Sequence, residues 1–144
     1  MTQDIGTFDL RETTTVLGNV SIDGYATGDS ITIQQDGDTY NSEGGADGFT
    51  DRIKNNATRL IITILLRQSS PINDELSALH IADRTTNKGI ADFAFEDLIG
   101  GTFVKAKSAW ITKPATIVNG NEAKQREWVI HTGSSYFVNV GGNK

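Results

Sequence analysis

The run Leu60–Leu66 limits most strongly what this chain can fold into, because six of its seven residues are apolar and both alternating faces carry apolar side chains. The run is too short to span a membrane, and its β-branched residues favour a strand over a helix. A strand that is apolar on both faces is typical of the inside of a sheet that is covered on both sides. The run therefore predicts a central strand buried on both faces.

The segment that follows carries the strongest helix signal in the chain. The hydroxyl of Ser70 can accept hydrogen bonds from the free amides of a first helical turn, and Pro71 suits the first helical position. Asp74 and Glu75 lie near the positive end of the helix dipole. Apolar residues recur on one face at helical spacing: Ile72, Leu76 and Leu79. We expect a helix over about residues 71–84.

The other segments alternate apolar and polar residues, which is typical of half-buried strands. Expected strands cover residues 13–22, 31–33, 91–96, 102–111, 126–131 and 136–140. This pattern predicts a mainly β fold, a β-sandwich or barrel of antiparallel strands with one flanking α-helix. The length of 144 residues suggests a single domain over residues 1–144, with residues 1–12 as an arm.

Composition and motifs argue against several classes of function. The chain has no cysteine, so disulfides, thiolate metal sites and a cysteine nucleophile are excluded. Residues 1–6 lack the basic region and apolar core of a secretory signal, and no stretch is long enough for a membrane-spanning helix. No Walker loop, Rossmann fingerprint, His-Glu-x-x-His motif or nucleophile elbow occurs. We therefore expect no catalytic residues, no cofactor and no metal.

Two pairs of ionisable residues could suggest acid–base chemistry. His80 and Asp83 share a helix face, but such a pair is far more often a surface hydrogen bond. Glu96 and Asp97 are neighbours in an expected strand, so their side chains should point to opposite faces. His131, in a late strand, is most simply structural. An enzyme is therefore the weakest hypothesis for this chain.

Charge is distributed unevenly along a chain whose net charge is −5. There are ten acidic residues and one basic residue up to Asp51, but eight acidic and twelve basic residues beyond it. Such a split can be a chance property of surface loops, or it can make one end of the molecule complementary to another copy. Both explanations stay open at this point.

The segment Asp36–Asp51 is acidic, rich in glycine and about sixteen residues long, which is typical of a functional or mobile loop. It does not fit a calcium-binding loop, since Tyr40 replaces an oxygen ligand and Asn41 replaces the required glycine. It is either a solvated hairpin tip or a self-assembly contact. We expect it to be mobile in a free subunit and ordered in an assembly.

Two tryptophans accompany basic residues in a way that could suggest nucleic-acid binding. Alternation places Trp110 on the face opposite Lys105 and Lys107, which indicates a core position, whereas the position of Trp128 stays open. A pI near 4.9 also argues against a nucleic-acid surface. We expect both lysines to pair with carboxylates where subunits meet.

Several segments together resemble a known family. They are the helix segment Ser70–Leu79 with Ala82-Asp83-Arg84 after it, then Ala109–Pro114, Arg126–Thr132 and Val140–Asn143. In this order and spacing they resemble the small tail tube proteins of long-tailed bacteriophages, especially contractile-tailed ones. The resemblance covers roughly residues 13–143, but the acidic segment matches no motif of the family.

The resemblance implies a structural virion protein, a subunit of hexameric rings that stack into a hollow tail tube. Its partners would be further copies of itself and the tail sheath, baseplate and tail terminator proteins, and genomic DNA would pass through without specific binding. The protein would be assembled in the host bacterial cytoplasm and reside in the tail of the virion. Candidate contacts between subunits are Asp36, Asp38, Glu43, Asp47, Lys105 and Lys107.

Two alternatives remain open from the sequence. The chain could be a β-sandwich module that binds a ligand or a receptor, which clustered exposed aromatic residues would favour. It could also be the tube protein of a related contractile injection system or bacteriocin, whose fold is similar.

Overall fold

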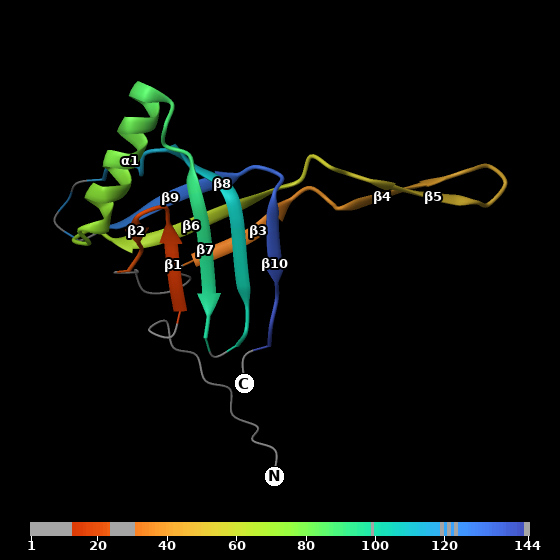
Figure 1. Ribbon diagram of the computed structural model, residues 1–144, viewed down its shortest axis with the longest axis horizontal. Helices are drawn as coiled ribbons and strands as arrows, with labels where there is room; N and C mark the ends of the chain where they lie inside the picture. Colours follow the sequence, from red (N-terminus) through yellow and green to blue (C-terminus); the bar gives the residue numbers. More distant parts are fainter. Residues whose placement is uncertain are drawn as a thin grey trace, which may run out of the picture.

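The computed structural model describes residues 13–23, 31–98, 100–118, 120, 122 and 124–142, and it consists of antiparallel strands and one helix (Figure 1). In chain order the elements are β1 (Thr13–Leu17), β2 (Val20–Ser21), β3 (Ile31–Asp36), β4 (Tyr40–Gly44), β5 (Thr50–Lys54), β6 (Arg59–Arg67), α1 (Ile72–Thr86), β7 (Ala91–Asp97), β8 (Phe103–Lys113), β9 (Gln125–Thr132) and β10 (Tyr136–Asn139). The expected arm, residues 1–12, lies outside the described residues. The mainly β prediction is confirmed.

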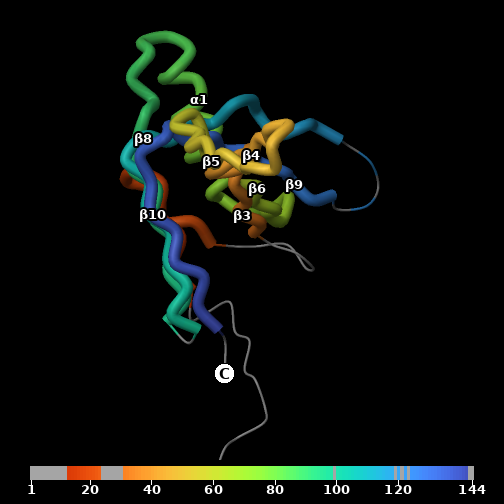
Figure 2. The backbone as a smooth tube through the Cα atoms, turned by 90° about the vertical axis from the view of Figure 1, so that its right-hand side faces the viewer, coloured from red at the N-terminus to blue at the C-terminus, as the bar shows by residue number. Residues whose placement is uncertain are grey.

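Eight of the strands form one sheet that folds into two layers. The first part of β8 pairs with β7 and β10, while its last part pairs with β9. One layer therefore has the order β2-β1-β7-β8-β10, and the other has the order β8-β9-β6-β3. Figure 2 shows the strands of the first layer standing beside those of the second, which are seen nearly end-on. Within the described residues the fold is a sandwich without a closed barrel.

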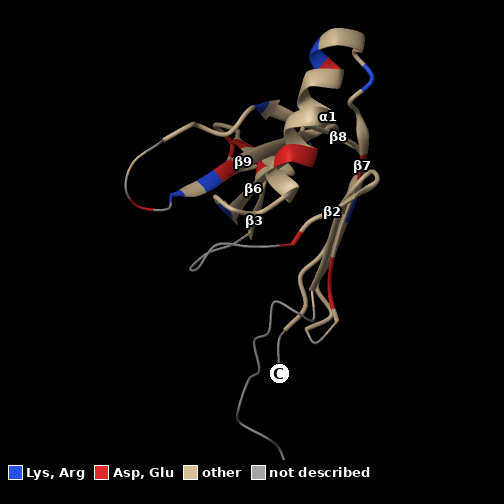
Figure 3. Ribbon diagram, turned by 90° about the vertical axis from the view of Figure 1, so that its left-hand side faces the viewer, with Lys and Arg blue, Asp and Glu red and all other residues tan. Residues whose placement is uncertain are grey.

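The hydrophobic core lies between the layers and beneath α1, which packs on β8 and β2. Leu76 is fully buried, Ile72 is buried, and Leu79 packs against the core from a half-buried position. The hydroxyl of Ser70 accepts a hydrogen bond from the amide of Ile72 at 3.3 Å. Asn87 ends the helix in the left-handed conformation (φ 58°). The expected helix is thus confirmed, and Figure 3 shows the acidic residues of its first turn.

Strand β6 is central, as predicted, because it pairs with β9 on one side and β3 on the other. The prediction that both of its faces are buried is wrong. One face is fully buried, but Ile61 and Leu65 on the other face are only half-buried. The helix packs on β8 and β2 instead, so it leaves this face of β6 partly open.

The expected single strand over residues 13–22 is instead a tight hairpin. Val16 pairs with Ser21 and Leu17 pairs with Val20, so that residues 18 and 19 form a two-residue turn. Gly18 has a φ of +60°, which favours glycine at the first position of such a turn. The buried face of β1 carries Thr15 and Leu17.

One side chain connects the start of α1 to the second layer. Trp128 of β9 is buried, and its indole Nε1 donates a hydrogen bond to Asn73 Oδ1 at 2.9 Å. The side-chain nitrogen Nδ2 of Asn73 in turn donates hydrogen bonds to the backbone carbonyl oxygens of Arg67 at 2.9 Å and Ser70 at 3.0 Å. Asn73 therefore holds the β6–α1 connection against β9, and Trp128 belongs to the core.

Replacement of Asn73 with Ala should lower the free energy of unfolding by about 1–3 kcal/mol, because it leaves the buried indole N–H without its acceptor. The measurement is a urea melt of monomeric protein followed by tryptophan fluorescence. Ser77→Ala, on the same helix, is a control with an expected loss below about 0.5 kcal/mol. Equal midpoints for wild type and Asn73→Ala would mean that the indole hydrogen bond does not contribute to stability.

Candidate assembly interface

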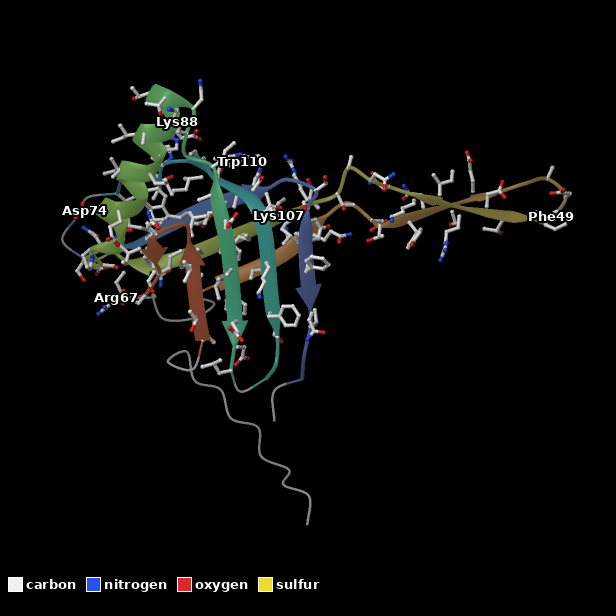
Figure 4. All side chains as sticks on the ribbon, in the orientation of Figure 1. Phe49, Arg67, Asp74, Lys88, Lys107 and Trp110 are labelled. Atoms are coloured by element: carbon white, nitrogen blue, oxygen red, sulfur yellow. The ribbon has the colours of Figure 1, made fainter. Side chains whose placement is uncertain are left out.

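The acidic segment does not form the long loop that its composition predicts, because most of it folds into a β-hairpin that projects from the sandwich (Figure 1). Tyr40 pairs with Lys54 at the base and Gly44 pairs with Thr50 near the tip. Every residue of β4 and β5 is exposed. Phe49 lies at the tip with 74% of its surface exposed (Figure 4). A hairpin that buries nothing in its own chain has surface available for a partner.

The two faces of this hairpin differ in charge, because directly paired residues share a face and faces alternate along each strand. One face carries Tyr40, Arg52 and Lys54, and the guanidinium of Arg52 lies 4.1 Å from the centre of the Tyr40 ring. The other face carries Glu43 directly opposite Asp51. We call the face with Glu43 and Asp51 the acidic face of the hairpin.

Hydrogen bonds between side chains fix the base of the hairpin to both layers. The hydroxyl of Tyr136, on β10, lies 2.8 Å from Gln35 Oε1 and 2.9 Å from Thr58 Oγ1. The side-chain nitrogen Nε2 of Gln35 donates hydrogen bonds to the backbone carbonyl oxygen of Gly37 and to Thr39 Oγ1, both at 2.9 Å. These bonds join β10 to the end of β3 and to the start of β6, between which the hairpin leaves the sandwich.

A groove opens on the outer face of the first layer, over β7, β8 and β10, with a volume of about 360 Å³. Its lining residues are Asp92, Phe93, Ala94, Lys105, Ala106, Lys107, Ser135 and Phe137. Phe137 is 72% exposed, and both lysines are exposed. Among the described residues neither lysine forms an ion pair. The groove thus combines an apolar surface with two cationic side chains and one carboxylate.

The prediction that Trp110 faces away from these lysines is wrong. Strand β8 contains a bulge. Phe93 of β7 pairs with Ala106 and Ala91 pairs with Ala109, so a step of two residues in β7 corresponds to three residues in β8. Such a bulge exchanges the faces of all later side chains. Ala109 and Ile111 are therefore buried, whereas Trp110 is half-buried on the same face as the lysines.

A second apolar opening lies at the side of the sandwich where β10 and β3 are edge strands. It is a cleft of about 230 Å³ that reaches the core. Its lining residues are Ile31, Ile33, Phe95, Thr102, Val104, Val138 and Val140. Val140 is 83% exposed, and Phe137 projects from the outer face of the same edge. Exposed apolar side chains beside an unpaired strand edge are typical of an interaction site.

The predicted contact residues divide between these surfaces. Glu43 lies on the acidic face of the hairpin, and Asp47 lies in the turn at its tip, where its carboxylate accepts a hydrogen bond from the amide of Phe49. Asp38 is exposed between β3 and β4. Asp36 forms an ion pair within the chain, since its carboxylate lies 2.9 Å from Nε of Arg59. Lys105 and Lys107 lie in the groove.

Sequence reasoning missed three residues that complete these surfaces: Phe49, Asp51 and Phe137. For Phe137 the signal was the expected strand over 136–140, which places it on the face opposite Tyr136 and Val138. Residues 40–54 do not alternate apolar and polar side chains in a way that predicts strands. The glycine content of the acidic segment favoured a loop, so neither Phe49 nor Asp51 was assigned to a strand.

The ionisable pairs serve local structure. The carboxylate of Asp83 accepts a hydrogen bond from the amide of Gly89 at 3.1 Å, and that of Asp97 accepts one from the amide of Gly100 at 3.2 Å. Glu96 is exposed on the face opposite Asp97. Within the described ranges His, Asp and Glu do not gather in groups of three that could hold a metal ion. No helix in the described part of the chain is long and apolar enough to cross a membrane.

His131 lies half-buried on β9, paired with Ile61 and Trp110. Burial lowers the pKa of His131 below its usual 6.5, the positive charge of Arg59 lowers it further, and the carboxylate of Asp36 acts in the opposite direction. The folded state therefore favours the neutral imidazole. As the pH falls below 6.5, the unfolded chain takes up the proton more readily, so stability is lost on acidification.

Acidification from pH 7.5 to pH 5.5 should therefore lower the melting temperature of the wild type more than that of a His131→Gln variant. The glutamine variant lacks the titrating imidazole but keeps a polar side chain of similar length. The measurement is a set of thermal melts of both proteins in matched salt. If the two melting temperatures fall in parallel, then His131 does not contribute to the pH dependence.

No protein-family profile matches this chain. The chain is 27% identical over 129 residues to Structural protein ORF10 of Pseudomonas phage KPP10, and the match covers 86% of this chain and 73% of the phage protein. Two solved structures have a similar fold. The anti-feeding prophage cap, a tube terminating cap, matches with a TM-score of 0.60 and 11% identity over 96% of each chain. A chain of the native gene transfer agent particle matches with a TM-score of 0.61 and 11% identity, over 92% of this chain and 99% of that one.

Proposed function

We propose that this chain is a structural protein of a phage virion, and in particular a tail tube subunit that forms hexameric rings stacked into a hollow tube. The relative from the Pseudomonas phage supports a structural role in a virion. The two solved structures share the fold and come from the cap that terminates the tube of an anti-feeding prophage and from the virion of a gene transfer agent. The observation that carries the proposal is the exposed hairpin, which projects from a sandwich whose β10 edge is apolar and open.

Two kinds of contact are needed to build a stacked tube from one chain. A ring closes when an edge of one copy meets a different surface of the next, in a heterologous contact that returns to its start. The unpaired edge of β10, with Val138, Val140 and the neighbouring cleft, suits such a contact. The hairpin, which reaches beyond the sandwich, suits the contact between rings. The same construction would serve a contractile injection system.

DNA would pass through this tube without being bound. A conduit must let the genome slide, and a net charge of −5 opposes the counterion release that holds DNA on basic surfaces. The partners would be further copies of the chain, together with sheath, baseplate and terminator proteins of the tail.

Electron microscopy of the purified chain at increasing concentration tests this proposal. We expect rings of six copies and hollow stacks of such rings, with a matching rise in sedimentation coefficient. Protein that stays strictly monomeric at high concentration would contradict self-assembly. A compact monomer that binds a soluble ligand in the groove would favour the ligand-binding module instead.

A further inference from the structure

We propose that the hairpin tip of one copy docks in the groove of another copy, with Phe49 against Phe137 and the acidic face of the hairpin against Lys105 and Lys107. This inference rests on the proposed function, since it names the residues through which one ring would contact the next. It commits to a second copy of this chain as the occupant of the groove.

The acidic face of the hairpin lacks compensation within its own chain. Glu43 and Asp51 are directly opposite each other across β4 and β5, and like charges in this position destabilise a strand pair. No ion pair to either residue forms among the described residues. A cation supplied by a partner would relieve this repulsion. The exposed ring of Phe49 at the tip would in turn lose contact with water if a partner covered it.

The groove offers what the hairpin lacks. Lys105 and Lys107 lie two residues apart on one face of β8, so they are separated along the strand by about 6.6 Å. This spacing is close to that of a directly opposed strand pair, about 4.5–5.5 Å, so each lysine can reach one of the two carboxylates. The volume of about 360 Å³ lies within the range of clefts that bind small ligands, and therefore admits one phenyl ring.

The occupant has to be another copy, because the hairpin cannot fold back on its own groove. The bonds of Tyr136 to Gln35 and Thr58 fix the base of the hairpin. Figure 4 shows Phe49 at the end of the hairpin that points away from the sandwich, while Lys107 lies on β8 within it. Charge complementarity also favours a second copy, because the acidic first third of the sequence would meet the more basic remainder. Asp92 in the groove reduces this complementarity but leaves an excess of positive charge.

Charge reversal tests this contact. Lys105→Glu with Lys107→Glu should abolish stacking, as should Glu43→Lys with Asp51→Lys, because each pair of changes places like charges across the contact. All four changes in one chain should restore at least a tenfold larger stacked fraction than either pair alone. Lys88→Glu with Lys113→Glu is the matched control, since it changes exposed lysines elsewhere by the same charge. Electron microscopy and sedimentation velocity measure the stacked fraction, with thermal melts to verify folding.

The aromatic part of the contact has its own test. Phe49→Ala should weaken stacking about tenfold or more, since aromatic anchors dominate such contacts. Ile117→Ala is the control. Ile117 is 76% exposed and belongs to neither the hairpin nor the groove, so this variant should stack as the wild type does.

The outcomes separate this inference from the proposed function. Wild-type tubes that also form in the charge-reversed variants would overturn the hairpin contact and leave the tube proposal intact. If the matched control also loses stacking, the hairpin contact is overturned, because a general effect of charge then explains the loss. Binding of duplex DNA that is lost with Lys105→Glu and Lys107→Glu, while stacking is unchanged, would assign the groove to nucleic acid. A wild type that never associates would overturn both proposals.

Discussion

Leu76→Ala is expected to lower the free energy of unfolding by about 2–5 kcal/mol, as large-to-small changes in a core do. Leu76 is fully buried where α1 packs on the sandwich, so its removal leaves a cavity among well-packed neighbours. Because α1 contacts β8 and β2, the loss should destabilise the whole fold and not only the helix. Denaturant melts at a protein concentration that keeps the chain monomeric measure this value.

Ile81→Ala provides a matched control on the same helix. Ile81 is 61% exposed, so its truncation removes a similar side chain without opening a cavity. Its expected effect is below about 0.5 kcal/mol, the usual range for surface changes. An effect of Leu76→Ala in that same range would contradict the packing of α1 on the core.

Replacement of residues 41–53 with Asn-Gly is expected to abolish stacking while the sandwich stays folded. Tyr40 and Lys54 are directly paired, so a two-residue Asn-Gly turn can join them without changing the register. All residues of β4 and β5 are exposed, and the core loses none of its side chains. The melting temperature should therefore remain close to that of the wild type.

The measurement for this variant pairs electron microscopy with sedimentation velocity. Single rings without stacks are the expected result, because the open β10 edge is left unchanged. Tubes of normal length and stability from the shortened chain would show that the hairpin is not a contact between rings.

The sequence predicted most of the secondary structure where pattern and local chemistry agreed. The helix over Ile72–Thr86 is preceded by Pro71 and by Ser70, whose hydroxyl accepts a hydrogen bond from the amide of Ile72, and its spaced apolar face packs on the core. The central position of β6 followed from its β-branched residues. That one face of β6 is only half-buried could not be predicted, because composition does not say which element the helix covers.

Two features escaped sequence reasoning for physical reasons. The bulge in β8 depends on how the strand pairs with β7, and no residue near Lys107 signals it, so Trp110 was assigned to the wrong face. The segment Asp36–Asp51 was predicted as a loop because it is rich in glycine and acidic residues, and β4 and β5 lack the apolar–polar alternation that predicts strands. The candidate contacts were predicted from charge alone, and their division between hairpin and groove required the fold.

Strand β8 runs unbroken through both layers, and this has a mechanical consequence. The hairpin springs from β3 and β6 in one layer, whereas the groove lies on β7, β8 and β10 in the other. A force on the hairpin passes from β6 to β9 and from β9 to β8 through the hydrogen bonds between paired strands, and then along the backbone of β8 to the groove. The layers therefore cannot slide past each other without bending β8 or breaking these pairings. In a stack of such subunits, each copy would behave as a rigid unit that transmits tension and torque from its hairpin tip to its groove.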